Sequence, residues 1–282
     1  MKFLVTGFGG FIGQVCQRIL IEQGHRLLPI VRRAEKQQET IVWDFKSPLT
    51  EIPPVDGVIH LAASVHFKEA LDPQLYAVNV LGTYHLARLA QKMGAFFVFA
   101  STIGVHGQSA RIGPQTEIAP SSHYAMSKLL AEHLLEEVTK NSVILRIGGV
   151  YGLHGPSHLS LNTAITQAYE DRKVPVLKGN GAGRRNYLSV TDAARWICTV
   201  AQNPTDYAGK ILYLASPEHL TIRQYLEEIS RVLTDGRPFI EEPGKDTSDV
   251  LIEPSPVPFA LSNLSDYLKG LAQKRPLVGQ RV

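Results

Sequence analysis

Short hydrophobic runs alternate with longer stretches of helical periodicity through the first half of the chain. The runs are rich in β-branched and aromatic residues and have the length of buried strands. Between them, apolar residues recur three and four positions apart, which is the spacing of one helix face. The residues predicted as strands are 2–6, 26–31, 40–43, 58–61, 96–100 and 143–147.

Three helices follow from this spacing. In the first, the apolar residues fall on one stripe: Ile12, Val15, Cys16, Ile19 and Leu20. Gly24 ends this helix, and the other two cover residues 71–93, ended by Gly94, and residues 124–140. Because strands and helices alternate, we predict an α/β fold with a doubly wound, mostly parallel sheet that has helices on both faces.

The pattern loosens beyond Gly148, where glycine and proline become frequent. We predict a first domain over residues 1–148 and a smaller, partly discontinuous lobe over residues 149–282. Two segments near residues 187–215, at 187–190 and 211–214, are candidates to return to the main sheet. The tail over residues 241–282 is rich in proline and charge and allows no prediction.

A glycine-rich turn joins the first predicted strand to the first predicted helix. Its sequence is Thr6-Gly7-Phe8-Gly9-Gly10-Phe11-Ile12-Gly13. Glycines let the chain turn tightly and approach a pyrophosphate, while the helix N-terminus offers N–H groups to the anion. A plain structural turn is the alternative, but the strand before it and the helix after it favour a dinucleotide site on a Rossmann-like sheet.

Four further motifs follow in order: His60-Leu61-Ala62-Ala63, Asn79-Val80-x-Gly82-Thr83, Ser101-Thr102 and Tyr124-x-x-x-Lys128. With the glycine turn they resemble the extended short-chain dehydrogenase/reductase superfamily, and within it the NAD-dependent epimerase/dehydratase family of nucleotide-sugar enzymes. The resemblance covers residues 1 to about 195. It implies that residues 1–148 bind a dinucleotide and that residues 149–282 mainly bind the substrate. The residues that it implies at the cofactor are Gly7, Gly10, Phe11, Ile12, Gly13, Asp44, Leu61, Ala62, Ala63 and Lys128.

The end of the second predicted strand bears on the choice between NAD and NADP. NAD-using relatives have an acidic residue there that binds the adenosine ribose, whereas this chain has Val31, followed by Arg32 and Arg33. Guanidinium groups match the oxygens of a ribose phosphate, so we predict NADP, with NAD and two merely solvated arginines as the alternative. Asp44 resembles the aspartate that meets the adenine, and a turn cap is its alternative role.

Tyr124 and Lys128 are one helical turn apart and project from the same face. An ammonium group beside a phenol favours the phenolate, so we predict that Lys128 lowers the pKa of Tyr124 toward the working range. Thr102 lies at the carboxyl end of a predicted strand, where ligands of such sheets bind. The resemblance implies that these three residues are catalytic and that Lys128 also bonds the nicotinamide ribose.

The two residues after Thr102 discriminate among the reactions of the family. Members that eliminate water carry an Asp-Glu pair there, whereas this chain has Ile103 and Gly104, which cannot exchange protons. We therefore predict keto-sugar reduction or 4-epimerisation by hydride transfer on a nucleotide sugar, and not a 4,6-dehydratase. Two alternatives stay open: a non-catalytic dinucleotide-binding sensor or assembly protein, and a small-molecule carbonyl reductase of the same fold.

The expected substrate pocket departs from the family pattern. His106 stands in place of a tyrosine, and Gly149 in place of an asparagine. Arg185 resembles the arginine that contacts the diphosphate of the substrate, with Arg184 as the alternative. The residues predicted to line the sugar pocket, each with a structural role as the alternative, are Ser64, His66, His106 and His154.

Composition adds several negative predictions. The chain has 29 basic and 26 acidic residues, a formal net charge of +3 and no basic block, so neither nucleic acid nor a membrane is an expected partner. Only two cysteines are present, no signal peptide is recognisable, and no apolar run approaches the ~18 residues of a membrane span, so we predict a cytoplasmic protein. The histidines show no metal-ligand spacing, and no metal is predicted. The family resemblance implies a homodimer that forms through the helices at 71–93 and 124–140.

Overall fold

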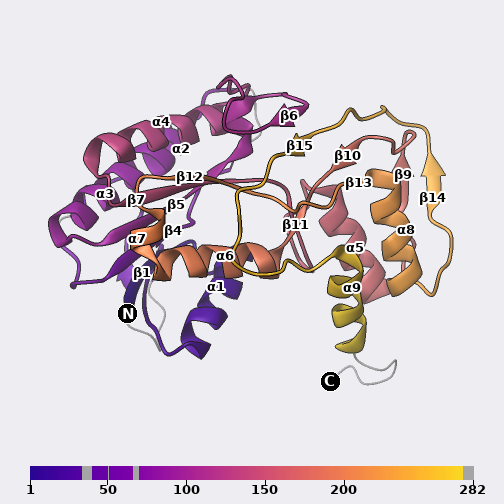
Figure 1. Cartoon of the computed structure of the whole chain (residues 1–282), viewed down its shortest axis with the longest axis horizontal. Helices are drawn as coiled ribbons and strands as arrows, with labels where there is room; N and C mark the ends of the chain where they lie inside the picture. Colours follow the sequence, from indigo (N-terminus) through magenta and orange to yellow (C-terminus); the bar gives the residue numbers. More distant parts are fainter. Residues whose placement is uncertain (34–39, 50, 66–69, 276–282) are drawn as a thin grey trace. The chain divides into compact units, whose positions relative to one another are not determined.

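The computed structural model describes residues 1–33, 40–49, 51–65 and 70–275, and the chain divides into two compact units. Unit 1 comprises residues 1–109, 114–147 and 193–214, and unit 2 comprises residues 110–113, 148–192 and 215 onward. The chain passes between the units several times, so neither is one continuous stretch of sequence. Figure 1 shows the elements of both units.

Unit 1 is built on a sheet whose strands, in spatial order, are β12 (Ile211–Leu214), β7 (Ser142–Ile147), β5 (Phe96–Thr102), β4 (Gly57–His60), β1 (Lys2–Thr6), β2 (Arg26–Val31) and β3 (Ile41–Val42). All of their pairings are parallel. The strand order reverses at β1, so the prediction of a doubly wound, mostly parallel sheet is confirmed. Ligands of such sheets bind at the carboxyl ends of the strands at the point of reversal, which here lies between β1 and β4.

Helices cover both faces of this sheet (Figure 1). On one face lie α1 (Phe11–Glu22) and α6 (Val190–Gln202), and on the other lie α3 (Gly82–Met93) and α4 (His123–Val138). The two cysteines, distant in sequence, meet between α1 and α6, where Cys198 Sγ lies 3.8 Å from the carbonyl oxygen of Cys16. Because both faces are covered, the central strands are apolar almost throughout, which is why short hydrophobic runs predicted them well.

The helix predicted at residues 71–93 consists of three pieces: α2 (Pro73–Tyr76), the π-helical turn η1 (Ala77–Leu81) and α3. Asp72 begins α2 by accepting a hydrogen bond from the Gln74 N–H at 2.9 Å. Within η1, Asn79 is buried, and the hydroxyl of Thr83 donates to its carbonyl oxygen at 2.7 Å. π-turns of this kind frequently occur at functional sites.

Unit 2 contains α5 (Ser160–Asp171), α8 (Ile222–Leu233) and α9 (Leu264–Gln273), which pack around a core of their own. Thr221 and Gln224 form a capping box at the start of α8. Among its described residues, unit 2 also has four pairs of short strands: β10 (Arg184–Arg185) with β13 (Leu220–Thr221), β11 (Leu188–Ser189) with β8 (Val150–Tyr151), β14 (Ile240–Glu242) with β9 (Val176–Lys178), and β15 (Leu251–Ile252) with β6 (Arg111–Ile112).

Only one of the two candidate segments returns to the main sheet. Residues 211–214 do so as β12, beside β7. Residues 187–190 instead contribute β11 to unit 2, because the Tyr187 N–H donates to the Tyr225 hydroxyl at 3.1 Å and Leu188 pairs with Val150.

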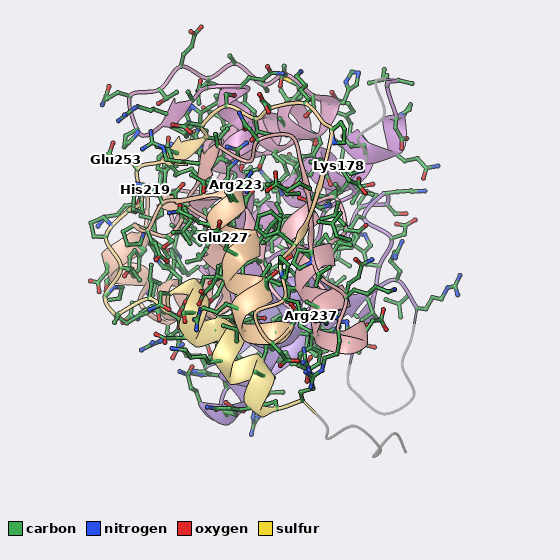
Figure 2. The ribbon with its side chains drawn as sticks, turned by 90° about the vertical axis from the view of Figure 1, so that its right-hand side faces the viewer. Lys178, His219, Arg223, Glu227, Arg237 and Glu253 are labelled. Carbon is green, nitrogen blue, oxygen red and sulfur yellow. The ribbon has the colours of Figure 1, made fainter. Side chains whose placement is uncertain are left out.

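Over residues 241–275, the tail makes most of its contacts with distant parts of unit 2. Arg223 of α8, labelled in Figure 2, binds Glu241 of β14 at 2.8 Å. Further along, the Asn186 side chain donates to the Ile252 carbonyl at 2.7 Å and accepts from its N–H at 3.0 Å. Because such contacts join residues far apart in sequence, local periodicity could not predict them.

Candidate active site

The glycine-rich turn between β1 and α1 has a geometry that only small residues permit. Gly7 has a φ of +70°, and a Cβ there would lie 2.7 Å from the backbone nitrogen of Ala62. A Cβ on Gly13 would lie 2.1 Å from the carbonyl oxygen of Gly7. Gly10, the N-cap residue of α1, has no side chain with which to cap the helix, so the helix N-terminus can present its N–H groups to an anion. The turn therefore fits the pyrophosphate of a dinucleotide.

Replacing Gly13 with alanine is expected to disrupt this turn. The new methyl group would press on backbone that cannot yield cheaply, so we expect a loss of about 1–3 kcal/mol in the free energy of unfolding. We also expect roughly tenfold weaker dinucleotide binding, because the turn must shift to admit the methyl group. Gly9→Ala is the matched control, because a Cβ on Gly9 meets nothing within 4 Å. Chemical denaturation and calorimetric titration measure both effects, and equal behaviour of the two variants would contradict the assignment.

The segment after β4, residues 61–63, lies against the glycine turn. The Ala62 N–H donates to Thr6 Oγ1 at 3.1 Å, and Thr6 Oγ1 lies 2.6 Å from His60 Nδ1. The other ring nitrogen of His60 lies 2.9 Å from Thr83 Oγ1. Burial lowers the pKa of His60 well below its usual range. His60 is thus a neutral side chain that holds the ends of β1 and β4 together.

Asn79 fixes the next residues of the same segment. Its side chain accepts from the Ser64 N–H at 2.7 Å and donates to the Ser64 carbonyl at 2.9 Å. It also donates to Ser127 Oγ of α4 at 3.0 Å. The chain after β4 is therefore tied to the helix that carries Tyr124. A substrate contact by the Ser64 hydroxyl stays a prediction, and His66 lies outside the described residues.

Thr102 is the last residue of β5 and caps the short 3-10 turn η2 (Ile103–His106). Its Oγ1 accepts a hydrogen bond from the Gly104 N–H at 3.1 Å, so its hydroxyl proton can still be donated. A Cβ on Gly104 would lie 3.3 Å from Thr102 Oγ1 and 3.5 Å from Ala125 Cβ. Gly104 thus lies close both to the Thr102 hydroxyl and to Ala125 in the first turn of α4, which includes Tyr124.

Lys128 lies on α4, four residues after Tyr124, and is buried, with 2% of its surface exposed. Its Nζ lies 4.1 Å from the centroid of the Phe99 ring, a cation–π contact with β5. Burial lowers the pKa of Lys128 to about 7, and the charge of Glu132 opposes that shift. The amine is therefore poised between its charged and neutral forms near neutral pH.

The pKa of Tyr124 shifts in the opposite direction to our prediction. Burial raises it to about 12, whereas we expected Lys128 to lower it. The prediction was wrong because it left out the burial of the phenol itself, which disfavours the charged phenolate. At neutral pH the phenol of Tyr124 is thus protonated, the form that gives a proton to a substrate oxygen.

The residues predicted at the adenosine end lie beyond β2 and β3. Arg32 and Arg33 directly follow β2 and are both exposed. Asp44 accepts hydrogen bonds from the backbone N–H groups of Lys46 at 2.9 Å and Ser47 at 3.4 Å, and these bonds lower its pKa. Asp44 therefore caps a turn, which was its alternative role. An adenine contact through its other carboxylate oxygen stays a prediction.

In unit 2, β10 carries the two arginines considered for the diphosphate. Arg184 is neutralised by Asp249, whose Oδ2 lies 2.7 Å from its Nη2 and 3.0 Å from its Nε. Arg185 instead donates from Nη1 to the carbonyl oxygens of Arg184 at 2.8 Å and Ser248 at 2.6 Å. Because carbonyl groups orient a guanidinium without neutralising it, Arg185 is the better anion-binding candidate of the two.

Other candidate chemistry is sparse. Across residues 1–33, 40–49, 51–65 and 70–275, no three His, Cys, Asp or Glu side chains gather in a way that could hold a metal ion. Over the same ranges, every helix is too short or too polar to cross a bilayer. His154 is an exposed residue of unit 2 and lies 3.6 Å from Glu170.

Known proteins with similar sequences match most of this chain. The model of the NAD dependent epimerase/dehydratase family matches residues 3–215. The chain belongs to this family. An uncharacterized UDP-glucose epimerase of Bacillus subtilis (strain 168) is 26% identical over 266 residues, which cover 82% of each chain. The UDP-glucuronate 4-epimerase of Thermodesulfobacterium geofontis is 27% identical over 266 residues, which cover 82% of this chain and 80% of the relative.

Solved structures of the family share the fold. The UDP-N-acetylglucosamine 4-epimerase from Bacillus cereus has a TM-score of 0.82 at 20% identity, over 97% of this chain and 96% of the other. The UDP-glucuronic acid 4-epimerase from Bacillus cereus, solved in complex with NAD, has a TM-score of 0.78 at 22% identity over the same shares. The predicted family, fold and enzyme class are thereby confirmed: the chain is an enzyme of the extended short-chain dehydrogenase type.

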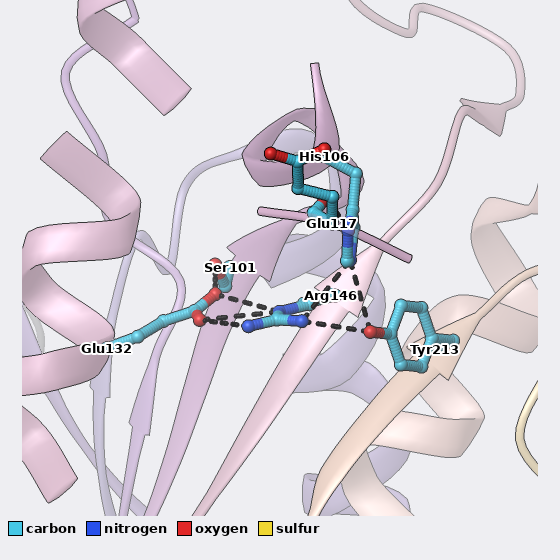
Figure 3. Close-up of polar contacts among 6 residues, drawn as sticks. All are labelled: Ser101, His106, Glu117, Glu132, Arg146 and Tyr213. Carbon is cyan, nitrogen blue, oxygen red and sulfur yellow. Dashed lines mark hydrogen bonds and ion pairs between the residues drawn. The ribbon is translucent and has the colours of Figure 1, made fainter. Parts of the chain in front are cut away.

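A buried polar network in unit 1 of this epimerase-family enzyme was not predicted from the sequence (Figure 3). At its centre, Arg146 Nη2 binds Glu132 Oε2 at 2.8 Å, with the two side chains 9% and 2% exposed. The hydroxyl of Ser101 donates to Glu132. Arg146 Nη1 donates to the Tyr213 hydroxyl at 2.9 Å. One feature of the sequence could have predicted this network: Glu132 lies one helical turn after Lys128, on a helix face that is otherwise buried. A buried carboxylate needs a partner.

The sequence predicts a substrate contact for His106, but in the structure its ring is bound within this network. Only 1% of the residue is exposed. Its Nδ1 lies 2.9 Å from the Glu117 carbonyl, and its Nε2 lies 3.1 Å from the Tyr213 hydroxyl and 3.2 Å from Arg146 Nη1. With both ring nitrogens bonded to protein groups, His106 has the structural role that was its alternative.

Proposed function

We propose that this enzyme transfers a hydride between a nicotinamide dinucleotide and a carbon of a nucleoside-diphosphate sugar, with Thr102, Tyr124 and Lys128 as its catalytic residues. The main support is the position of Thr102 at the carboxyl end of β5, next to Gly104, which approaches both the Thr102 hydroxyl and Ala125 in the first turn of α4. The glycine turn of β1, which would hold the dinucleotide, follows a strand of the same sheet. When bound, the nicotinamide supplies or accepts the hydride.

The protein groups manage the proton and the substrate oxygen. Tyr124, protonated at neutral pH, gives its proton to the oxygen of a keto-sugar, and in the reverse direction takes it back. Thr102 accepts from the Gly104 N–H, which leaves its own proton to donate to the same oxygen. Lys128, buried on α4 with Tyr124, orients the nicotinamide ribose. In its protonated form it also gives the site a positive charge.

Two reactions fit this arrangement. Net reduction of a keto-sugar is favoured by the protonated state of Tyr124 and by the arginines after β2. Epimerisation at C4 is favoured by relatives such as the UDP-glucuronate 4-epimerase. Elimination of water is not supported, because Ile103 and Gly104 offer no titratable group beside Thr102.

Product analysis separates these reactions. The panel consists of UDP-glucose, UDP-glucuronic acid and UDP-N-acetylglucosamine together with their 4-keto forms, each tested with NADPH, NADP and NAD. Reduction consumes one NADPH per keto-sugar, whereas epimerisation changes the sugar without net cofactor turnover. Loss of water from the sugar, or turnover only with simple ketones, would contradict the proposal.

We further propose NADP as the preferred dinucleotide. Exposed Arg32 and Arg33 lie at the carboxyl end of β2, next to β1, where a ribose phosphate could be bound. Replacing both with alanine is expected to weaken NADP binding by roughly 10- to 100-fold, because a charged hydrogen bond contributes about 1.5–3 kcal/mol. NAD binding should change little. Fluorescence titration with both dinucleotides measures this, and a wild-type preference for NAD would contradict the proposal.

Arg185 is proposed to bind the diphosphate of the substrate. Arg185→Ala is expected to weaken UDP binding by roughly tenfold or more, because the residue carries a charge that no carboxylate among the described residues neutralises in an ion pair. Arg184→Ala is the matched control, since the charge of Arg184 is already bound to Asp249. Calorimetric titration with UDP measures both variants. A larger loss in Arg184→Ala than in Arg185→Ala would reverse the assignment.

A cytoplasmic homodimer completes the proposal. Met126 and Leu130 are exposed one turn apart on α4, and Leu81 of η1 is also exposed. Exposed apolar side chains that lie together are typical of protein–protein contacts. The helices predicted to form the dimer therefore offer apolar groups to a partner.

A further inference from the structure

The buried ion pair of unit 1 holds the chain on both sides of Thr102 (Figure 3). Immediately before Thr102, the Ser101 hydroxyl donates to Glu132. Four residues after it, at the end of η2, His106 Nε2 lies 3.2 Å from Arg146 Nη1. Glu132 and Arg146 bind each other through three hydrogen bonds. The strand end and the turn that flank Thr102 are therefore fastened to one rigid pair of charges.

The partners of His106 decide which ring nitrogen carries the proton. The Glu117 carbonyl, 2.9 Å from Nδ1, can only accept, so Nδ1 must donate. Arg146 Nη1, beside Nε2, can only donate, so Nε2 must accept. The Tyr213 hydroxyl accepts from Arg146 at 2.9 Å and can donate to the same Nε2 at 3.1 Å. Both Arg146 and the Glu117 carbonyl are satisfied at the ring only when His106 is neutral and protonated on Nδ1.

We propose that His106 is a positioning residue for Thr102, and that it acts only as the neutral imidazole with its proton on Nδ1. The proposal rests on the proposed catalytic role of Thr102. His106 touches no reacting atom, but it anchors the turn whose Gly104 N–H binds Thr102 Oγ1. The hydroxyl can aim its proton at a substrate oxygen only while that turn stays in place.

Protonation of His106 would break this arrangement. A proton on Nε2 would face the Arg146 guanidinium at 3.2 Å, and the Tyr213 hydroxyl, which accepts from Arg146, would have to turn its own proton away to accept from the imidazolium as well. The charged and titratable groups around the ring are Arg146 of β7, Glu132 of α4 and Tyr213 of β12, and the segment before α4 contributes the Glu117 carbonyl. Glu132 is already bound by Arg146 and Ser101, so its negative charge does not fully offset the additional positive charge of a protonated His106. Burial lowers the pKa of His106, so the ring is neutral at neutral pH and positioning is lost only as the pH falls.

Two variants at position 106 distinguish the hydrogen-bond acceptor that His106 offers to Arg146 from the ability of the His106 ring to take up a proton. His106→Gln supplies a carbonyl oxygen near the position of Nε2 and does not titrate, whereas His106→Phe supplies no acceptor. We expect His106→Phe to lose about tenfold in kcat at neutral pH, part of the roughly 10²- to 10³-fold cost of losing such a donor outright, and to approach the wild type at acid pH, where the wild type loses the same positioning. His106→Gln should retain more of the activity at neutral pH and lack the acid-side fall in kcat that we expect of the wild type. Dinucleotide affinity should be unchanged in both variants, which shows that they are folded.

Imidazole nitrogen chemical shifts of His106, measured by NMR in the wild-type enzyme, test the proton position without turnover. Protonation on Nδ1 at neutral pH, with titration below the usual histidine range, is the expected result. A proton on Nε2, or a wild-type kcat and pH profile in His106→Phe, would overturn the proposal. Thr102→Ala, measured alongside, separates the positioning role of His106 from the catalytic role of Thr102. If it loses activity while His106→Phe does not, the positioning role alone fails, whereas a wild-type kcat in Thr102→Ala removes Thr102 from the proposed function as well.

Discussion

Tyr124→Phe is expected to lower kcat by about 10²- to 10⁴-fold, the usual contribution of a positioned general acid. The phenol is protonated at neutral pH, because burial raises its pKa to about 12, so the variant removes the proton that the substrate oxygen would receive. The ring itself remains, and with it the packing of the first turn of α4. Dinucleotide affinity should therefore change little.

Tyr84→Phe is the matched control for this prediction. Tyr84 lies on α3 in the same unit, is partly buried against the core, and has no part in the site. It should keep kcat within about twofold of the wild type. Steady-state kinetics on the best substrate of the sugar-nucleotide panel compare the three proteins. Wild-type turnover in Tyr124→Phe would remove this residue from the mechanism.

Glu132→Gln is expected to have the largest effect on stability, about 3–5 kcal/mol in the free energy of unfolding. It leaves the buried Arg146 guanidinium without its counter-ion, and a buried unpaired charge is costly. For a chain of this size the loss corresponds to a fall in Tm on the order of 10 °C. Thermal unfolding followed by circular dichroism measures the shift.

An exposed ion pair of unit 2 is the control. Glu228 binds Arg231 at 2.5 Å, but the two side chains are 21% and 57% exposed. Glu228→Gln should therefore cost about 1 kcal/mol or less, because water solvates the charge left behind. If both variants unfold at similar temperatures, the network of Figure 3 does not contribute to the stability of unit 1 as we describe.

The central strands were predictable from sequence because both of their faces are buried and their apolar runs are nearly continuous, and the helices because their apolar residues recur on one face. The main exceptions are elements whose contacts are not local. The helix at 71–93 is interrupted by the π-helical turn η1, where the side chain of Asn79 bonds to Ser64 and Ser127, far from it in sequence. In the tail, β14 and β15 contain only three and two residues and are defined by pairing with distant strands.

The residues of the candidate site were predictable where the backbone geometry requires a particular residue type. They were less predictable where burial determines the pKa or the partners of a side chain. Gly7 and Gly13 stand out because a Cβ would collide with backbone. The direction of the Tyr124 pKa shift was mispredicted, because helical spacing places Lys128 on the same face but does not show that the Tyr124 phenol is itself buried. His106 shows the same limit, since its sequence neighbours reveal neither its burial nor its partners.

Deuterium transfer tests the central claim most directly. Wild-type enzyme and Tyr124→Phe are incubated with NADPH that carries deuterium at the transferred position of the nicotinamide, and with the 4-keto sugar nucleotides of the panel. Mass spectrometry of the sugars follows the label. We predict one deuterium on the sugar carbon with the wild type, at a rate that falls about 10²-fold or more in Tyr124→Phe. An unlabelled sugar with every keto substrate, or equal labelling rates in the two proteins, would contradict the account.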